Sequence, residues 1–147
     1  MHRLGGVRPR RPRRKPVGRL VTGVSGRALV LDEPLSLWGG MDPTTGELID
    51  AHHPQRGARL TGRVVVMPSG RGSSSSASVL AEAVRARTAP AAILLGEPDL
   101  ILAIGSAVAE ELYGVAVPIV VLPADRLAAI RDGTALLIGR DGSVKTA

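Results

Sequence analysis

The 147-residue chain contains no cysteine and no phenylalanine, and it has one tryptophan and one tyrosine. Without thiolates it forms no disulfide, no zinc–thiolate site, no thiolate-held iron–sulfur cluster and no cysteine nucleophile. So few aromatic rings also leave little surface on which nucleic-acid bases could stack. The sequence therefore predicts an aliphatic core, and nucleic acid is not an expected partner.

Long apolar runs are also missing. No run approaches the roughly 20 residues that a membrane helix needs, so no membrane association is expected. The N-terminus lacks the apolar core of a secretory signal, which favours a cytoplasmic location. The length and the 44% share of hydrophobic residues fit one domain with a buried core.

Acidic residues are absent from the first 19 positions, which hold eight of the 19 basic residues. The remaining chain carries eleven basic residues against all 13 acids, so the net charge of +6 belongs to the N-terminal segment. Prolines at positions 9, 12 and 16 disfavour helix and central strand there. We predict a disordered basic tail over 1–18, with either no function, weak RNA affinity or a targeting role, and one folded domain over 19–147.

Short apolar runs alternate with helical patterns in the body of the chain. We expect a β-rich start over 20–32 and a turn-rich connection over 33–61. The expected strands are 63–67, 91–95 and 118–122, the helices are about 78–87, 106–113 and 124–130, and a hairpin covers 135–146. A further apolar run at 100–104 precedes the middle helix, whose expected N-cap is Ser106. This order predicts a single α/β domain.

The Gly/Ser-rich segment Pro68–Ser78, with the sequence PSGRGSSSSAS, joins a predicted strand to a predicted helix. Backbone N–H groups at a helix N-terminus attract anions, and Gly70 and Gly72 allow a ligand to approach the backbone. A serine hydroxyl here can cap the helix, donate to a carboxylate or lose its proton. Both a functional loop and a flexible surface loop with a serine N-cap are consistent with this spacing, whereas a P-loop is not.

A second segment, S-L-W-G-G-M-D-P-T-T-G over 36–46, contains the only tryptophan, a glycine pair and Asp42 before a proline. It is either a structural turn anchored by Trp38, or a loop over a pocket with Asp42 or the Gly39–Gly40 backbone near the ligand. For the pair His52-His53, packing or hydrogen bonding is favoured over metal binding, since neighbouring side chains point in different directions.

Taken together, S-L-W-G-G-M-D-P-T-T-G, H-P-x-x-G and G-R-G-S-S-S-S occur in an order that resembles the small subunit, or swivel domain, of aconitase X-type dehydratases. The resemblance covers about 19–147 and implies an aconitase-like swivelling β/β/α domain. It implies a hydro-lyase that removes water from a hydroxy acid and is active only with a large subunit. That partner would carry the iron–sulfur or iron centre, because this chain has no thiolate to hold one.

The resemblance also assigns residues. Aligning Gly72-Ser73-Ser74 with the catalytic loop of the family makes Ser73 the expected base, while Ser74 and Gly72 hold the substrate anion. Classical aconitases have an arginine two positions after the catalytic serine, where this chain has Ser75, so Arg71 or a partner residue is expected to anchor the substrate instead. Gly39, Gly40 and Asp42 complete the expected binding residues.

Two substrates remain open within this resemblance. Cis-3-hydroxy-L-proline is favoured over phosphomevalonate, because the Ser-rich loop and the AEELYG segment look more like the bacterial members. A hypothesis of another class is a non-catalytic anion- or RNA-binding protein that uses the same fold. A large aconitase-like partner with several cysteines would favour the lyase.

Overall fold

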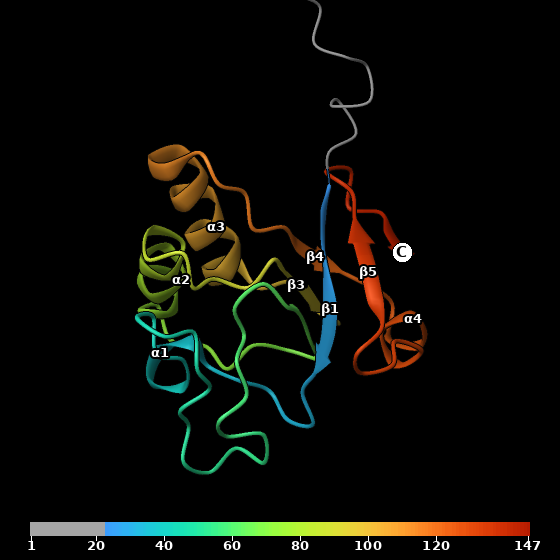
Figure 1. The fold of residues 1–147 in the computed structure, drawn as a ribbon, viewed down its shortest axis with the longest axis horizontal. Coiled ribbons are helices and arrows are strands. Elements are labelled where there is room, and N and C mark those ends of the chain that lie inside the picture. The colour runs from blue at the N-terminus through green and yellow to red at the C-terminus, as the bar shows by residue number, and fades with distance from the viewer. Residues whose placement is uncertain (1–22) are drawn as a thin grey trace, which may run out of the picture.

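The computed structural model describes residues 23–147, which form a six-stranded sheet in the order β4-β3-β2-β1-β5-β6 (Figure 1). Strands β1 to β4 run parallel, β5 pairs antiparallel with β1, and β6 pairs antiparallel with β5. The strands are β1 Val24–Val30, β2 Val64–Met67, β3 Ala92–Leu95, β4 Ile119–Val121, β5 Ala135–Ile138 and β6 Val144–Thr146.

Helices lie on both faces of this sheet. Strand side chains alternate between the two faces, so Val65 and Met67 of β2 pack toward α2 and α3, whereas Val64 and Val66 pack toward α4. All residues of β2 and β3 are buried, which explains their uninterrupted aliphatic sequence. The predicted α/β single domain is confirmed. The helices are α1 Leu37–Gly40, α2 Ser76–Arg85, α3 Leu100–Tyr113 and α4 Ala124–Ala128.

Helix α3 corrects the sequence prediction. The helix starts at Leu100 and not at about 106, because the Asp99 side chain accepts a hydrogen bond from Leu102 N at 3.0 Å and caps it. The predicted N-cap, Ser106, lies inside the helix and donates its hydroxyl to the carbonyl of Val117. The C-terminal end agrees with the prediction, since Gly114 terminates α3 in the left-handed conformation at φ 67°.

Other boundaries shift by a few residues. The β-rich start expected over 20–32 is, in its described part, one strand that continues through Gly26. A Cβ at Gly26 would lie 2.6 Å from Gly62 O. Helix α2 begins two residues earlier than expected, at Ser76. The predicted tail over 1–18 lies outside the described residues. Within 23–147, none of the helices combines the length and apolarity needed to cross a membrane.

Helices α2 and α3 are packed so closely that one glycine is required between them. A Cβ at Gly105 would lie 2.9 Å from both Cα and O of Ala77. Because backbone atoms cannot move aside as a side chain can, Gly105→Ala should destabilise the domain by about 1–3 kcal/mol despite the better helix propensity of alanine. Chemical denaturation measures this loss. Gly72→Ala, where a Cβ meets no atom within 4 Å, is the matched control, and equal stability of both variants would contradict the prediction.

Candidate functional site

Three loops leave the sheet at one edge, because β1, β2 and β3 are parallel and end side by side (Figure 1). The loop after β2 carries the Gly/Ser segment, and the loop after β1 carries Trp38 and the glycine pair. An isolated parallel bridge joins Leu35 to Gly70, and Arg71 N donates to Leu35 O at 3.4 Å. The two segments identified in the sequence are therefore neighbours in the fold.

A narrow recess, without room for a water-sized molecule inside it, lies where these loops meet. Among the predicted site residues, Arg71, Gly72 and Ser73 line it, while Ser74, Gly39, Gly40 and Asp42 do not. Ser76 and Asp99 also line the recess, and the sequence interpretation gave neither a role. The cap that Asp99 provides to α3 is the signal that was available for it, since an Asp before an apolar run is a typical N-cap.

The Ser73 side chain is half-buried on the wall of the recess. Its Oγ accepts a hydrogen bond from Ser75 N at 3.3 Å, and its carbonyl accepts one from Ser76 N at 2.9 Å. An N–H donated to Oγ favours negative charge on that oxygen, as does the nearby N-terminus of α2. This arrangement suits an oxygen that gives up its proton. Ser75 is the N-cap residue of α2, as the surface-loop interpretation anticipated, but its side chain makes no capping hydrogen bond.

The two loop glycines have different surroundings. A Cβ at Gly70 would collide with the Asp99 carboxylate, so packing within this chain favours glycine there. A Cβ at Gly72 would meet no atom within 4 Å, and the residue is exposed. Contacts among the described residues therefore do not explain the glycine at position 72. This agrees with the prediction that a ligand approaches the backbone there.

The loop over 36–46 is held by Leu37 and Gly40, and not by its tryptophan. The Trp38 side chain is 59% exposed, so its interpretation as a packing anchor is wrong, whereas Leu37 is fully buried. A Cβ at Gly40 would lie 2.6 Å from Leu35 Cδ1, and Gly39 adopts φ 77° in an exposed turn. The glycine pair thus lets the chain turn tightly beside the recess with an indole pointing outward.

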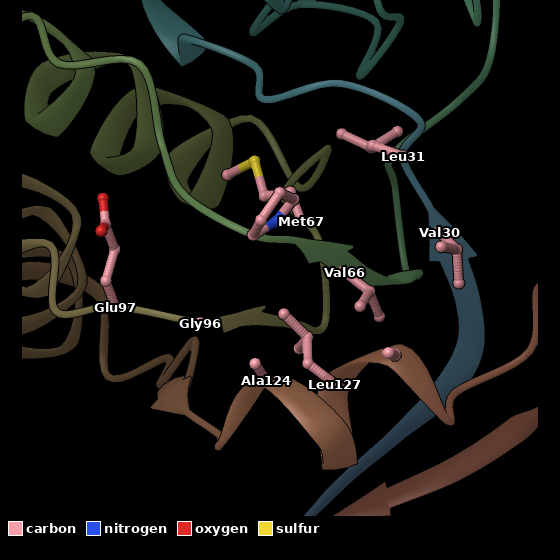
Figure 2. Close-up of a pocket in the computed structure, with 10 residues that line it drawn as sticks. Val30, Leu31, Val66, Met67, Gly96, Glu97, Ala124 and Leu127 are labelled. Carbon is pink, nitrogen blue, oxygen red and sulfur yellow. The ribbon is translucent and has the colours of Figure 1, made fainter.

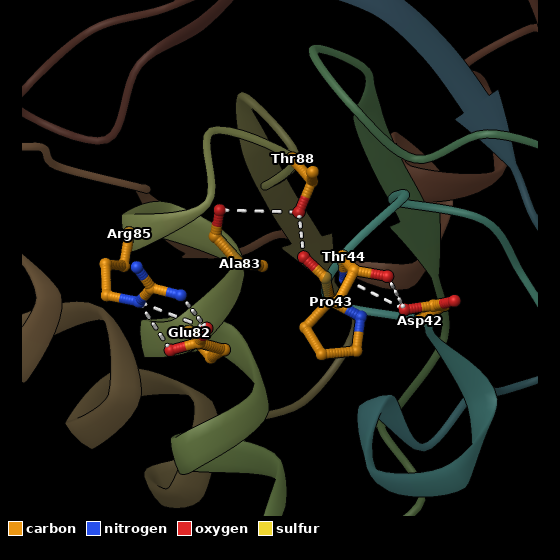
Figure 3. A network of polar contacts seen from close by, with 7 residues as sticks. All are labelled: Asp42, Pro43, Thr44, Glu82, Ala83, Arg85 and Thr88. Carbon is orange, nitrogen blue, oxygen red and sulfur yellow. Dashed lines mark hydrogen bonds and ion pairs between the residues drawn. The ribbon is translucent and has the colours of Figure 1, made fainter.

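Asp42 organises the turn that follows (Figure 3). Its Oδ1 accepts hydrogen bonds from Thr44 N at 2.8 Å and from Thr44 Oγ1 at 2.7 Å, and these bonds lower the pKa of the carboxyl below its usual range. Thr88 Oγ1 donates to Pro43 O at 2.6 Å and fastens the turn to the end of α2. The carboxylate of Asp42 therefore bonds within its own turn. The part of this loop that is available to the site is its backbone.

A larger pocket lies on the opposite face of the same edge, under α4 (Figure 2). It has a volume of about 410 Å³ and contains the side chains of Val66, Ala124 and Leu127, with Glu97 as its only charged lining residue. None of the predicted site residues lines it, and it offers no cation or hydroxyl to a carboxylate. The recess brings Arg71 and the serine loop together, with the Asp99 carboxylate on the same wall, whereas the lining of the larger pocket is mainly apolar.

The described residues do not fit an iron–sulfur centre. The sequence has no cysteine, and over 23–147 no three His, Asp or Glu side chains are grouped as metal ligands. His53 is buried, with Nε2 at 3.0 Å from Glu33 O, and its Nδ1 accepts a hydrogen bond from Gln55 N at 3.1 Å. Both ring nitrogens of His53 are thus engaged by the backbone, which confirms the hydrogen-bonding interpretation of this histidine.

By its fold and its loop chemistry, this chain is an α/β domain that presents a serine-rich loop at the carboxyl ends of parallel strands. Residues 17–146 match the family model described as the aconitase X swivel domain, and the chain belongs to this family. The resemblance predicted from the three motifs, and with it the aconitase-like swivel fold, is confirmed.

Similar proteins of named function include two kinds of dehydratase. Cis-3-hydroxy-L-proline dehydratase of Pseudomonas aeruginosa is 53% identical over 104 residues, which are 70% of this chain and 18% of that protein. The phosphomevalonate dehydratase small subunit of Methanopyrus kandleri is 44% identical over 91 residues, 62% of this chain and 67% of that one. The chain thus spans less than a fifth of the first relative.

A solved structure agrees with these relatives. The holo-form of aconitase X from Thermococcus kodakaraensis superposes with a TM-score of 0.74 at 29% identity, over 87% of this chain and 93% of that chain.

The Asp42 turn gives a pH-dependent prediction. Because the pKa of Asp42 is lowered in the folded chain, the stability that its bonds to Thr44 contribute is present above the unfolded-state pKa and is lost as pH falls through the folded-state pKa. The Thr44 amide resonance should therefore titrate with a midpoint below that of an ordinary aspartate. Asp42→Asn keeps an acceptor oxygen without a titration and is the control; a midpoint at or above the ordinary value would refute the prediction.

Proposed function

We propose that this chain is the swivel-domain small subunit of an aconitase X-type hydro-lyase that dehydrates a hydroxy acid, with cis-3-hydroxy-L-proline as the favoured substrate. The observation that carries the proposal is the position of Ser73, on the wall of the recess, with a backbone N–H donated to its Oγ. The 53% identity to a cis-3-hydroxy-L-proline dehydratase supports the choice of substrate.

In the proposed reaction Ser73 Oγ, as the alkoxide, takes the proton on the carbon next to the substrate carboxylate. The C–H bond breaks and an O–H bond forms on Ser73, the C–H electron pair becomes the new C=C bond, and the C–O bond of the neighbouring hydroxyl breaks. The departing hydroxide takes up a proton from solvent and leaves as water, and Ser73 returns its proton to solvent, which restores the alkoxide and balances the reaction. The Ser75 N–H and the N-terminus of α2 stabilise the charge on Oγ before the transfer.

Substrate binding is assigned to the same loop. Arg71 is exposed beside Ser73, and its guanidinium supplies the positive charge that classical aconitases place at the position of Ser75 here. Ser74 and the loop N–H groups hold the carboxylate, and Gly72 lets it approach the backbone. Gly39 and Gly40, which follow the recess-lining Leu37 in the chain, are assigned a backbone contact at the edge of this position, with Asp42 keeping the turn in shape.

The rest of the enzyme is assigned to a partner. The recess has no room for a water-sized molecule, whereas ordinary ligand sites have roughly 300–1,000 Å³, so this chain supplies only one wall of the site. A large aconitase X-type subunit, present in the cytoplasm with this chain, supplies the other wall and carries the iron–sulfur or iron centre. The residues matched to the Pseudomonas aeruginosa relative are 18% of that protein, which supports a large further part beside this domain.

Two alternatives remain. The 44% identity to a phosphomevalonate dehydratase small subunit favours phosphomevalonate as the second candidate substrate. The basic residues near the N-terminus favour, from another class, a non-catalytic anion- or RNA-binding protein. Assaying the co-expressed subunit pair with both substrates separates the two dehydratases, and a pair without turnover whose small subunit binds RNA would favour the binding protein.

Replacing the proposed base tests the mechanism. Ser73→Ala removes the oxygen that receives the proton, so turnover by the subunit pair should fall by about 10²–10⁴-fold, with assembly unchanged. Steady-state kinetics and size-exclusion chromatography measure the two effects. Ser78→Ala, an exposed serine on α2, is the matched control and should keep wild-type activity. Near wild-type turnover in Ser73→Ala would exclude this serine as the base and direct the test to Ser74.

A further inference from the structure

One buried hydroxyl joins the two loops of the candidate site. Ser76 is only 4% exposed, and its Oγ accepts a hydrogen bond from Trp38 N at 3.2 Å. The same oxygen lies 3.3 Å from Ser36 Oγ. Both contacts join the first turn of α2 to the segment that follows β1. Ser36 and Ser76 are 40 residues apart in the sequence. Ser76 therefore fastens the turn that carries the exposed indole.

The backbone of the same residue contacts the proposed base. Ser76 N donates to Ser73 O at 2.9 Å, so the carbonyl of Ser73 and the amide of Trp38 are both held by one residue. Within the serine run 73–76, Ser76 is the residue that hydrogen-bonds to both loops, through its hydroxyl to Trp38 and through its amide to Ser73. A displacement of Ser76 or of the Trp38 turn would consequently move the Ser73 peptide within the recess.

The hydrogen-bonding capacity of Ser76 also separates it from the base. A serine oxygen offers two acceptor positions and one proton. One acceptor position is taken by the Trp38 N–H, and the Ser36 hydroxyl lies within bonding distance of the same oxygen. Buried and engaged in this way, Ser76 is not placed to exchange a proton with a substrate, although it is one of four serines that are indistinguishable in the sequence.

We propose that Ser76 is a positioning residue, whose hydroxyl holds the Trp38 turn against the serine loop and so fixes the orientation of Ser73. The proposal rests on the proposed role of Ser73 as base. It predicts that the geometry of the reacting oxygen, and not the affinity for substrate, depends on Ser76. Misplacing a reacting group by about 1 Å costs on the order of 10²-fold in rate, so the effect falls mainly on kcat.

The test compares Ser76→Ala with Ser78→Ala in the subunit pair. We expect kcat to fall by about 10–100-fold in Ser76→Ala while KM changes by less than about threefold, and both to stay unchanged in Ser78→Ala. In the free chain, hydrogen exchange at the Trp38 amide should become at least about tenfold faster in Ser76→Ala only. Ser36→Ala, which leaves the Trp38 bond in place, should have a smaller effect on both measurements.

Each result decides between explanations. Faster exchange at Trp38 with wild-type kcat would overturn the positioning role, and unchanged exchange would show that the Ser76 hydroxyl does not hold the turn. Failure of the proposed mechanism gives a different result, namely wild-type turnover in Ser73→Ala, which would show that Ser73 is not the base. If kcat then fell in Ser76→Ala alone, Ser76 would be positioning a group other than Ser73. A rise in KM with unchanged kcat in Ser76→Ala would also overturn the proposal.

Discussion

The parallel pairing of β1, β2 and β3 is the constraint on which the rest of the structure depends. Val30 pairs with Val66, and Val66 pairs with Leu94, so the three strands end in adjacent rows. Backbone hydrogen bonds continue beyond the strands, from Gly96 N to Pro68 O at 2.9 Å for example. The loops that follow therefore start side by side, and the serine loop lies next to the Trp38 turn because of the register of the sheet.

The aliphatic runs of β2 and β3 could be predicted because burial on both faces leaves an uninterrupted pattern. The start of α3 could not be predicted in the same way, since a five-residue apolar run is compatible with strand and with buried helix. Two contacts decide it: Asp99 caps the helix through Leu102 N, and Gly105 lies against Ala77 of α2. The cap is a local signal in the sequence, whereas the contact between Gly105 and α2 is not visible in a local pattern.

The candidate site was predictable as a segment but not as a set of roles. Four consecutive serines have the same chemistry in the sequence. The start of α2 at Ser76 places that residue on the buried face of the helix with Leu80, whereas Ser73 lies in the loop before the helix and is half-buried. The single tryptophan was open to two interpretations, and its exposure excludes the structural one. Motif order gave the family, whereas burial and hydrogen bonding separate positioning groups from reacting ones.

The absence of cysteine and the small recess have one common explanation in the proposed enzyme. A base must be close to the substrate only while the reaction occurs, whereas a metal centre needs a permanent set of ligands. A separate small domain can present Ser73, Arg71 and the α2 N-terminus on closing, and exclude water at the same time. Such a domain needs no thiolates because it holds no metal, but its loop must have the reactive conformation before the domain closes. The two-sided burial of β2, the Asp42 turn and the Ser76 contact provide that shape within the chain itself.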